Sequence, residues 1–180
     1  MKSATKENLA REAIEKFLKN REILKVNPKE LDKNLRKKTG CFVTVYIEGE
    51  LRGCIGNHSP DRPLHKAIID NVIHAVSADF RFPPVKKSEL KKLTLSVTVL
   101  TPLKKYKPES SEKLLKFLEK EKPGVLIEKE GRQALFLPQV WEELPCPADF
   151  LNELCFKAGL PAFSWQSKTI FWIFFEDKSF

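Results

Sequence analysis

A turn signal between two alternating apolar stretches is the feature that most restricts how this chain can fold. Residues 41–47 are rich in β-branched and aromatic side chains, Glu48-Gly49-Glu50 marks a turn, and residues 51–56 return as a second strand. This pattern predicts an antiparallel hairpin. A helical pattern over about 63–78 and an alternating strand over 94–100 follow the hairpin, which gives the order hairpin, helix, strand.

The same order occurs again in the second half of the chain. Residues 124–137 predict a hairpin that turns near Glu130-Gly131, residues 147–157 predict a helix, and residues 169–176 form a final apolar strand. Further helical patterns lie over residues 6–20, 28–37 and 110–120. We therefore predict an α+β fold with mainly antiparallel sheet and flanking helices.

The length of 180 residues suits a single compact domain, which we expect over residues 1–180. Within it we expect two unequal lobes, at about 1–100 and 110–180, connected by the proline-containing residues 101–110. Hydrophobic residues make up 42% and charged residues 31% of the chain, which is typical of a soluble globular protein.

Two absences in the sequence bear on its location. No stretch approaches the roughly 20 apolar residues that a membrane-spanning helix needs. The first seven residues are polar and lack the apolar core of a signal peptide. We therefore expect a cytoplasmic protein with no membrane partner.

The charge of the chain leaves nucleic acid open as a partner without favouring it. Lysine and arginine number 32 against 24 acidic residues, which gives a net charge of +8. The lysines fall in short clusters at predicted element ends and loops, and they are not interleaved with exposed aromatic residues as in a single-strand binding groove. A solvated lysine surface is the simpler interpretation.

The stretch Leu51–Gly56 is the strongest candidate for chemistry, because Gly53 and Gly56 flank Cys54 inside a predicted strand. Glycine weakens a strand interior and usually marks a bulge, a bend or a close backbone approach. If Ile47 lies opposite Leu51, the apolar residues of the hairpin form one face, Val43, Val45, Ile47, Leu51 and Ile55, and the opposite face carries Thr44, Tyr46, Arg52 and Cys54.

Arg52 and Cys54 then become neighbours on one face, and a nearby guanidinium favours the reactive thiolate form of cysteine. Two plainer interpretations stay open. Cys54 can be a small buried apolar residue, and the glycines can simply let another backbone pack against the strand. His58 and His65 are candidates for proton transfer beside Cys54, but no nearby residues complete a metal site. We predict no metal and no cofactor.

Residues 79–85 form a second notable stretch, in which Pro83 and Pro84 stiffen a loop. Asp79 and Arg81 are close enough to pair or to bond the loop backbone. Scaffolding is the favoured role of this loop. The alternative is that Arg81 holds an anionic ligand.

The sequence resembles a known family at these two stretches. Leu51–Gly56 is similar to the signature hexapeptide of the AMMECR-type domain family, whose bacterial and archaeal members are often called AmmeMemoRadiSam system protein A. Arg81–Pro84 with Ser88–Leu90 resembles the next block, and Leu135–Val140 and Lys157–Pro161 resemble later blocks. The similarity runs in order over nearly the whole chain.

This resemblance implies a compact α+β domain of two unequal lobes with the hexapeptide in a cleft region, and it specifies no reaction. It implies a Memo-like protein and a radical-SAM protein as partners. The functional residues suspected in the family correspond to Arg52, Gly53, Cys54 and Gly56. Many relatives have Thr where this chain has Asn57, which is a departure from the family pattern. The candidate ligand-binding residues are Tyr46, Gly53, Gly56, Asn57 and Arg81.

Two classes of function follow from these observations. The first is an enzyme or enzyme subunit in which Cys54 is a nucleophile or thiolate ligand, with Arg52 favouring the thiolate and His58 or His65 handling protons. The second is a non-catalytic adaptor that binds protein or nucleic acid through a basic surface. We favour the first, chiefly because of the family resemblance.

Overall fold

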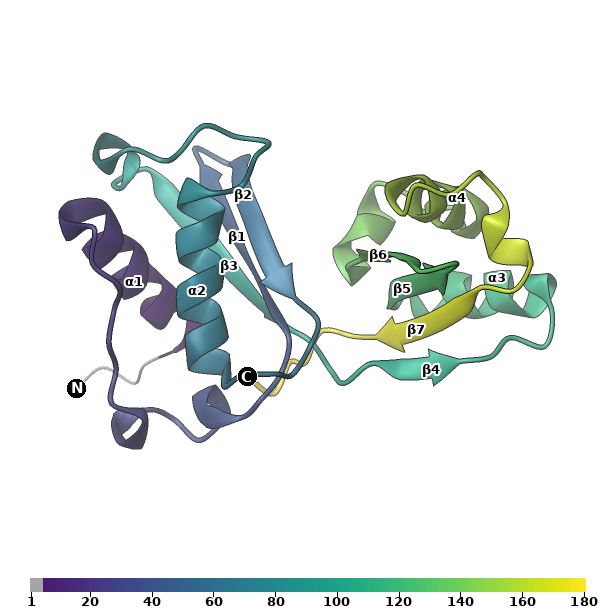
Figure 1. Cartoon of the computed structure of the whole chain (residues 1–180), viewed down its shortest axis with the longest axis horizontal. Helices are drawn as coiled ribbons and strands as arrows, with labels where there is room; N and C mark the ends of the chain where they lie inside the picture. Colours follow the sequence, from purple (N-terminus) through teal and green to yellow (C-terminus); the bar gives the residue numbers. More distant parts are fainter. Residues whose placement is uncertain (1–4) are drawn as a thin grey trace. The chain divides into compact units, whose positions relative to one another are not determined.

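Most periodic segments of the sequence form the helices and strands that their spacing predicts. The computed structural model describes residues 5–180, and its fold is α+β with two antiparallel sheets (Figure 1). The chain divides into two compact units. The first comprises the residues up to Leu100 together with Asp177–Phe180, and the second comprises Thr101–Glu176. No helix among residues 5–180 is both long and apolar enough to cross a membrane.

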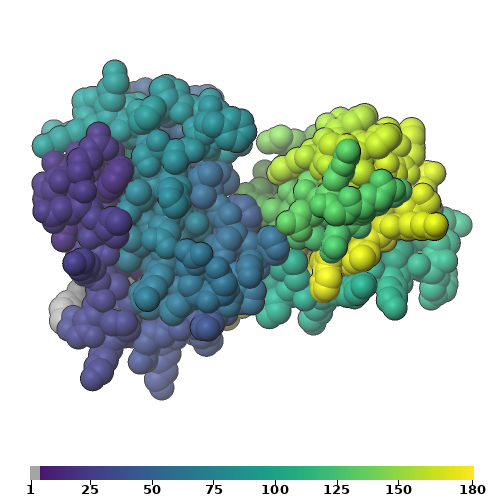
Figure 2. Space-filling model, in the orientation of Figure 1, coloured from purple at the N-terminus to yellow at the C-terminus, as the bar shows by residue number. Residues whose placement is uncertain are grey.

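The first unit is a three-stranded sheet with two helices on one face. Its elements are α1 (Lys6–Asn20), β1 (Cys41–Ile47), β2 (Glu50–Asn57), α2 (Leu64–Ser77) and β3 (Leu93–Val99). The strand order β2-β1-β3 makes β1 the central strand and β2 an edge strand. Helix α2 packs on β1 and β2, and α1 packs on α2 and β3, so that the two helices lie side by side (Figures 1 and 2).

The second unit is a four-stranded sheet with order β4-β7-β5-β6. Its elements are β4 (Lys104–Tyr106), α3 (Ser111–Glu121), β5 (Gly124–Lys129), β6 (Arg132–Phe136), α4 (Pro147–Lys157) and β7 (Ile170–Phe174). Its core includes Trp141 stacked on Phe150, with ring centroids 3.8 Å apart, and the buried Leu151 and Leu154 of α4.

Both units follow one order of elements, which is helix, hairpin, helix, strand. In each unit the last strand pairs with the first strand of the hairpin, on the side away from its second strand. The second strand of each hairpin, β2 or β6, is therefore an edge strand. Strand β4 is the addition that distinguishes the second unit.

One expectation about local structure is wrong. The helix expected over 28–37 is instead a pair of 3₁₀ turns, Pro28–Glu30 and Asn34–Arg36, because the carboxylate of Asp32 accepts the backbone N–H of Asn34 and interrupts the helical pattern. Strand β4 lies within residues 101–110, the segment expected to connect the two lobes. Further 3₁₀ turns are Lys87–Glu89, Pro138–Glu142 and Ser164–Gln166.

Candidate functional site

The hairpin of β1 and β2 turns through two residues and then inserts an extra residue. Glu48 and Gly49 both have positive φ, 54° and 91°, as expected for a tight hairpin turn, and Glu50 pairs with Ile47. The register shifts by one residue between Val45 and Tyr46, which leaves Arg52 as a bulge on β2. The three-residue turn expected from the sequence is therefore wrong.

On the far side of the bulge from the turn, the pairing of β1 with β2 agrees with the register that the apolar pattern predicts. Thr44 pairs with Cys54 and Val43 with Ile55. Between the turn and the bulge the pairing differs from that prediction. Leu51 pairs with Tyr46, and its side chain is 41% exposed. The expectation that Leu51 belongs to the core face is wrong.

Cys54 projects from the face of the sheet opposite α2. Its neighbour Gly53 faces α2 so closely that a Cβ atom there would lie 2.1 Å from the carbonyl oxygen of Ala75. Successive side chains of a strand point to opposite faces, so Cys54 points away from the helices. Its side chain is half-buried, and Sγ lies 3.4 Å from Oγ1 of Thr44.

The loop after α2 binds the backbone of Cys54 through two side chains. Asp79 Oδ2 accepts the N–H of Cys54 at 2.9 Å, and Arg81 Nη2 donates to its carbonyl oxygen at 3.2 Å. Arg81 in turn donates from Nε and Nη2 to both carboxylate oxygens of Asp79, at 2.9 and 2.6 Å. The Asp79–Arg81 pair therefore takes the place that a further strand would occupy beside the edge strand β2.

The hydrogen bonds between Asp79 and Arg81 shift the pKa values of both side chains. Asp79 is buried, yet the hydrogen bond from Arg81 lowers its pKa to about 2 against the opposing effect of burial. The hydrogen bond with Asp79 raises the pKa of Arg81, and the charge of the Cys54 thiolate is a smaller cause in the same direction. Among residues 5–180, Arg81 Nη1 has no hydrogen-bond partner, so it remains available to an incoming anion.

Arg52 does not face Cys54 as the shared-face argument predicts. Its Nη1 donates to the carbonyl oxygen of Pro83 at 2.5 Å, and its Nε lies 3.6 Å from the carboxylate of Glu89. The physical reason is the bulge, which removes Arg52 from the alternation that places every second residue on one face. Arg52 fixes the loop, and Arg81 supplies the guanidinium beside Cys54.

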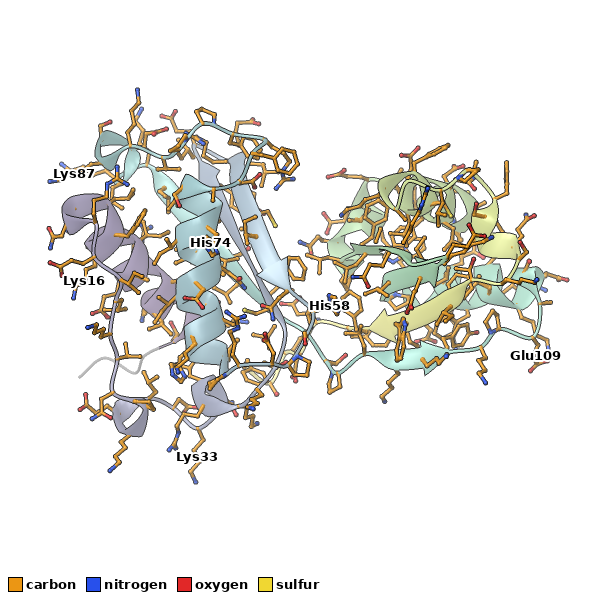
Figure 3. All side chains as sticks on the ribbon, viewed as in Figure 1. Lys16, Lys33, His58, His74, Lys87 and Glu109 are labelled. Carbon is orange, nitrogen blue, oxygen red and sulfur yellow. The ribbon has the colours of Figure 1, made fainter. Side chains whose placement is uncertain are left out.

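The structure places the two candidate histidines away from the Cys54 side chain. His65 is buried in the first turn of α2, with Nδ1 at 2.9 Å from the carbonyl oxygen of Leu35. Cys54 lies beside the other end of that helix, near Ala75, and ten residues of helix span about 15 Å. His58 follows the end of β2 (Figure 3), and four extended residues separate it from Cys54 by about 13 Å.

The other candidate residues have structural contacts. Gly56 lies under the ring of Phe42, where a Cβ atom would be 2.3 Å from a ring carbon. Asn57 donates to the carbonyl oxygen of Ser59 at 2.7 Å, and Tyr46 is half-buried on β1 opposite the bulge. The plainer interpretation of the glycines, a close approach by other groups, therefore explains Gly53 and Gly56.

The remaining cysteines differ from Cys54 in environment. All four cysteines are free. Burial raises the pKa of Cys41 to about 12, and burial also raises the pKa of Cys155. Cys146 is exposed at the N-terminus of α4. Among residues 5–180, no cluster of three or more His, Cys, Asp or Glu side chains is arranged to hold a metal ion.

Sequence reasoning missed what the Asp79–Arg81 pair does. The pairing of the two side chains is local and could be predicted, but their contact with Cys54 joins residues 25 and 27 positions apart. The glycine at position 53 was an available signal, because a strand residue without a side chain indicates the close approach of α2, and the loop follows that helix directly.

The chain matches the AMMECR1 family model over residues 7–180 and therefore belongs to the AMMECR1 family. It is 37% identical over 167 residues to Protein MK0488 of Methanopyrus kandleri, covering 88% of this chain and 78% of that protein. It is 42% identical over 170 residues to Protein PF1979 of Pyrococcus furiosus, covering 87% and 77%.

A solved structure is also similar to this chain. The crystal structure of the uncharacterized protein PH0010 from Pyrococcus horikoshii is 36% identical and superposes with a TM-score of 0.86. The match covers 94% of this chain and 86% of that chain, so it extends over both units.

Proposed function

We propose that this AMMECR1 family member is a cytoplasmic enzyme or enzyme subunit that uses the Cys54 thiolate as a nucleophile toward an anionic substrate held by Arg81. The observation that supports this proposal is the Asp79–Arg81 pair on the backbone of Cys54. It holds a guanidinium beside a half-buried thiol and leaves Arg81 Nη1 without a hydrogen bond to any residue that the structure describes. A guanidinium in this position both favours a thiolate and binds a carboxylate or phosphate group.

The edge strand of the second unit is bound in a different way, and this difference supports the proposal. Its edge strand β6 is also bound by the segment that follows its helix. Arg132 donates to the carbonyl oxygen of Gly159, and Lys157 donates to that of Leu135 at 2.9 Å. These contacts involve basic side chains and backbone carbonyl oxygens, whereas the first unit uses the Asp79–Arg81 pair beside a thiol. We infer a role for the thiol and the buried acid beyond protection of the edge strand.

The chemistry suited to this site is attack by sulfur on an electrophilic carbon. The thiolate forms the new S–C bond, and the leaving group departs with the electron pair of the bond that breaks. Water then cleaves the S–C bond, which releases the product and regenerates the thiol. In this proposal neither His58 nor His65 takes part in the first step, because both lie away from the Cys54 side chain.

The test is the alkylation of Cys54 by iodoacetamide, measured by peptide mass spectrometry across pH. Cys146 is an internal reference, because it is exposed in the same molecule. We expect Cys54 to react faster than Cys146 at neutral pH although it is less exposed. If Cys54 reacts more slowly than Cys146 at every pH, the nucleophile proposal is wrong.

The proposed partners are a Memo-like protein and a radical-SAM protein, as the family resemblance implies. Co-purification of the full chain with each candidate partner tests this part separately. Wild type and Cys54→Ser should be compared. If wild type and Cys54→Ser both capture a partner, the result would support a complex in which the thiol lies outside the interface. Failure of both partners to bind wild type would remove them from the proposal.

The alternative is an adaptor with a basic surface, and one observation favours it. The second unit contains 11 basic and 11 acidic residues, so the whole excess of +8 belongs to the first unit. The basic side chains are spread over that unit, as Lys16, Lys33 and Lys87 show (Figure 3). Nucleic-acid binding that weakens steeply with salt would support this alternative, and no binding of nucleic acid at low salt would exclude its nucleic-acid version, leaving a protein adaptor.

A further inference from the structure

The hydroxyl group of Thr44 lies against the sulfur atom of Cys54, with Oγ1 at 3.4 Å from Sγ. Thr44 belongs to β1 and Cys54 to β2, and the two residues are direct partners in the antiparallel register. Strand β1 is the central strand of its sheet, and Thr44 also pairs with Ser96 of β3. The hydroxyl is therefore carried by a backbone that is held by strands on both sides.

The contacts of the Cys54 backbone explain why these two side chains lie so close. Its N–H group donates to Asp79 and its carbonyl oxygen accepts from Arg81, so both groups point away from β1. Thr44 and Cys54 thus form the kind of antiparallel pair that exchanges no backbone hydrogen bonds. In such pairs the Cα atoms are about 4.5 Å apart, against about 5.5 Å in the other kind, and the side chains are closer.

The hydroxyl of Thr44 depends on this sulfur for its hydrogen bonding. Thr44 is only 4% exposed, and among residues 5–180 the Cys54 sulfur is the one hydrogen-bond partner of its Oγ1. A buried hydroxyl without a good partner is costly, and the sulfur of a neutral thiol is only a weak donor and a weak acceptor. A thiolate is a charged acceptor and forms the stronger bond. The hydroxyl is therefore better satisfied when Cys54 is ionised.

The other cysteine on these strands, Cys41, has a different donor. Asn71 Nδ2 lies 3.4 Å from its sulfur, but the same nitrogen also donates to the carbonyl oxygen of Cys41 at 3.1 Å and to Asn57 at 3.3 Å. Cys41 is fully buried, and burial raises its pKa to about 12. The contact at Cys54 differs in both respects, because the hydroxyl is not shared with other acceptors and the sulfur is only half-buried.

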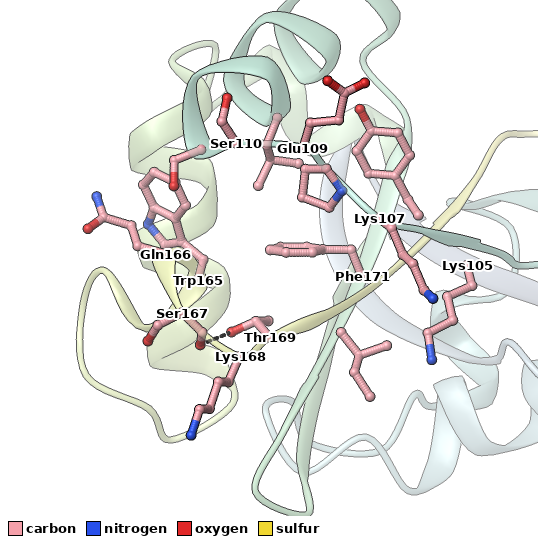
Figure 4. A pocket seen from close by; sticks show the side chains of 15 residues that line it. Lys105, Lys107, Glu109, Ser110, Trp165, Gln166, Ser167, Lys168, Thr169 and Phe171 are labelled. Atoms are coloured by element: carbon pink, nitrogen blue, oxygen red, sulfur yellow. Dashed lines mark hydrogen bonds between the residues drawn. The ribbon is translucent and has the colours of Figure 1, made fainter.

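Convergence on one residue also distinguishes Cys54 from the cavity of about 600 Å³ that lies beside β4 in the second unit. Lys105, Lys107 and Lys168 line that cavity, but Lys168 points away from the other two (Figure 4). The ammonium group of Lys105 lies over the ring of Trp172. At Cys54, by contrast, a buried hydroxyl, a carboxylate and a guanidinium all reach the same residue.

We propose that Thr44 is a positioning residue of the Cys54 site, whose hydroxyl donates to the thiolate and holds the sulfur in one orientation. This inference deepens the proposed function and rests on it. Thr44 is β-branched, and such a side chain is restricted about its first torsion angle, so its hydroxyl keeps its direction. The hydroxyl acts from the neighbouring strand β1, and the guanidinium of Arg81 acts from the loop on the outer side of β2.

The test is the alkylation of Cys54 by iodoacetamide in wild type, Thr44→Val and Thr44→Ser, measured by peptide mass spectrometry from pH 6 to pH 10. Valine has nearly the shape of threonine but no hydroxyl, and serine keeps the hydroxyl. We expect Thr44→Val to lower the ratio of the rate at pH 7 to the rate at pH 10 by about five- to tenfold, near the lower end for a hydrogen bond to a charged group. Thr44→Ser should restore most of this ratio.

The matched control is Thr98→Val. Thr98 is also a buried threonine of this sheet, but it lies on β3 and pairs with Phe42 instead of a cysteine. Its substitution should leave the ratio for Cys54 at the wild-type value. All four proteins keep the same ionisable side chains around Cys54, which are those of Tyr46, Arg52, Asp79, Arg81 and Glu89.

Three results would overturn the role of Thr44. They are a wild-type ratio in Thr44→Val, an equal loss in Thr44→Ser or Thr98→Val, and an equal slowing of Thr44→Val at both pH values, which would mean altered access to the sulfur. The proposed function has a separate criterion, because it is judged by the rates of Cys54 and Cys146 in wild type alone. Failure of the one is therefore distinguishable from failure of the other.

Discussion

The carboxylate of Asp79 accepts the backbone N–H of Cys54 at 2.9 Å, although 25 positions separate the two residues. Strand β2 lies at the edge of its sheet, and an edge strand presents unpaired N–H and C=O groups that invite pairing with another chain. The contact satisfies one such group, and Arg81 satisfies the carbonyl of the same residue. The backbone that carries the thiol is thereby fixed from outside the sheet.

Replacing Asp79 by asparagine should destabilise the protein by about 2 kcal/mol, as the lowered pKa of Asp79 implies. An asparagine can still accept the N–H of Cys54, but it loses the ionic hydrogen bonds to Arg81. Urea unfolding measures the change. Asp61→Asn is the control, since Asp61 is exposed and should change the free energy of unfolding by about 0.5 kcal/mol or less. Equal effects of the two substitutions would contradict this account.

The contribution of Asp79 should also depend on pH. Its pKa is about 2 in the folded protein and near 3.8 when unfolded, so its stabilisation is present above pH 3.8 and is lost as the pH falls toward 2. The difference in free energy of unfolding between wild type and Asp79→Asn should therefore shrink by about 2 kcal/mol between pH 5 and pH 2. The other carboxylates are common to both proteins and cancel. A difference that stays constant with pH would refute the role of the ionised carboxylate.

The fold could be predicted from the sequence where burial imposes a period. The apolar alternation of β1 fixed the pairing of Thr44 with Cys54, although the turn was wrong. A two-residue turn followed by a one-residue bulge gives the same register beyond the bulge as a three-residue turn. The apolar pattern cannot distinguish these two paths. Strand β4 could not be predicted, because Lys104–Tyr106 shows no alternation and pairs only with the distant β7.

The candidate site could be predicted only as far as Cys54 itself. Its strand face follows from alternation, but the guanidinium beside it comes from Arg81, 27 residues later. The sequence predicts Arg52 as the guanidinium beside Cys54, because residues two apart on a strand share a face. The bulge breaks this alternation at Arg52. Contacts that depend on how a loop returns to a strand are set by tertiary structure.

Substituting Gly53 by alanine should destabilise the first unit by about 3 kcal/mol or more, because the new methyl group would meet the carbonyl of Ala75 at 2.1 Å. Helix α2 would have to move away from the sheet. Gly131→Ala is a suitable control. Its position has open space but φ of 74°, so it should cost only about 1 kcal/mol. Urea unfolding again measures both. Similar costs would mean that α2 can shift easily.

Cys41 should report on unfolding of the first unit. It is fully buried, burial raises its pKa to about 12, and Asn71 donates to its sulfur. We expect iodoacetamide to modify Cys41 only after the chain unfolds, at a rate that follows the urea transition, while the exposed Cys146 reacts throughout. Modification of Cys41 at neutral pH without denaturant would show that the strand opens locally.

Substitutions of Arg52 and Arg81 should affect different properties, because Arg52 binds the loop and Arg81 lies beside Cys54. Arg52→Met removes hydrogen bonds to the carbonyls of Pro83 and Pro84, so it should lower the free energy of unfolding by about 1 kcal/mol and leave the alkylation of Cys54 nearly unchanged. Arg81→Met removes the positive charge beside the thiol, so it should slow alkylation of Cys54 at neutral pH several-fold.

Because Arg81→Met also leaves Asp79 unpaired, its rate must be compared with that of Asp79→Asn, which keeps the guanidinium. Slow alkylation in Arg81→Met with near-normal alkylation in Asp79→Asn would assign the effect to charge. Equal slowing in Arg81→Met and Asp79→Asn would assign the effect to the position of the Cys54 backbone. Slowing in Arg52→Met alone would support the original prediction that Arg52 and Cys54 share a face.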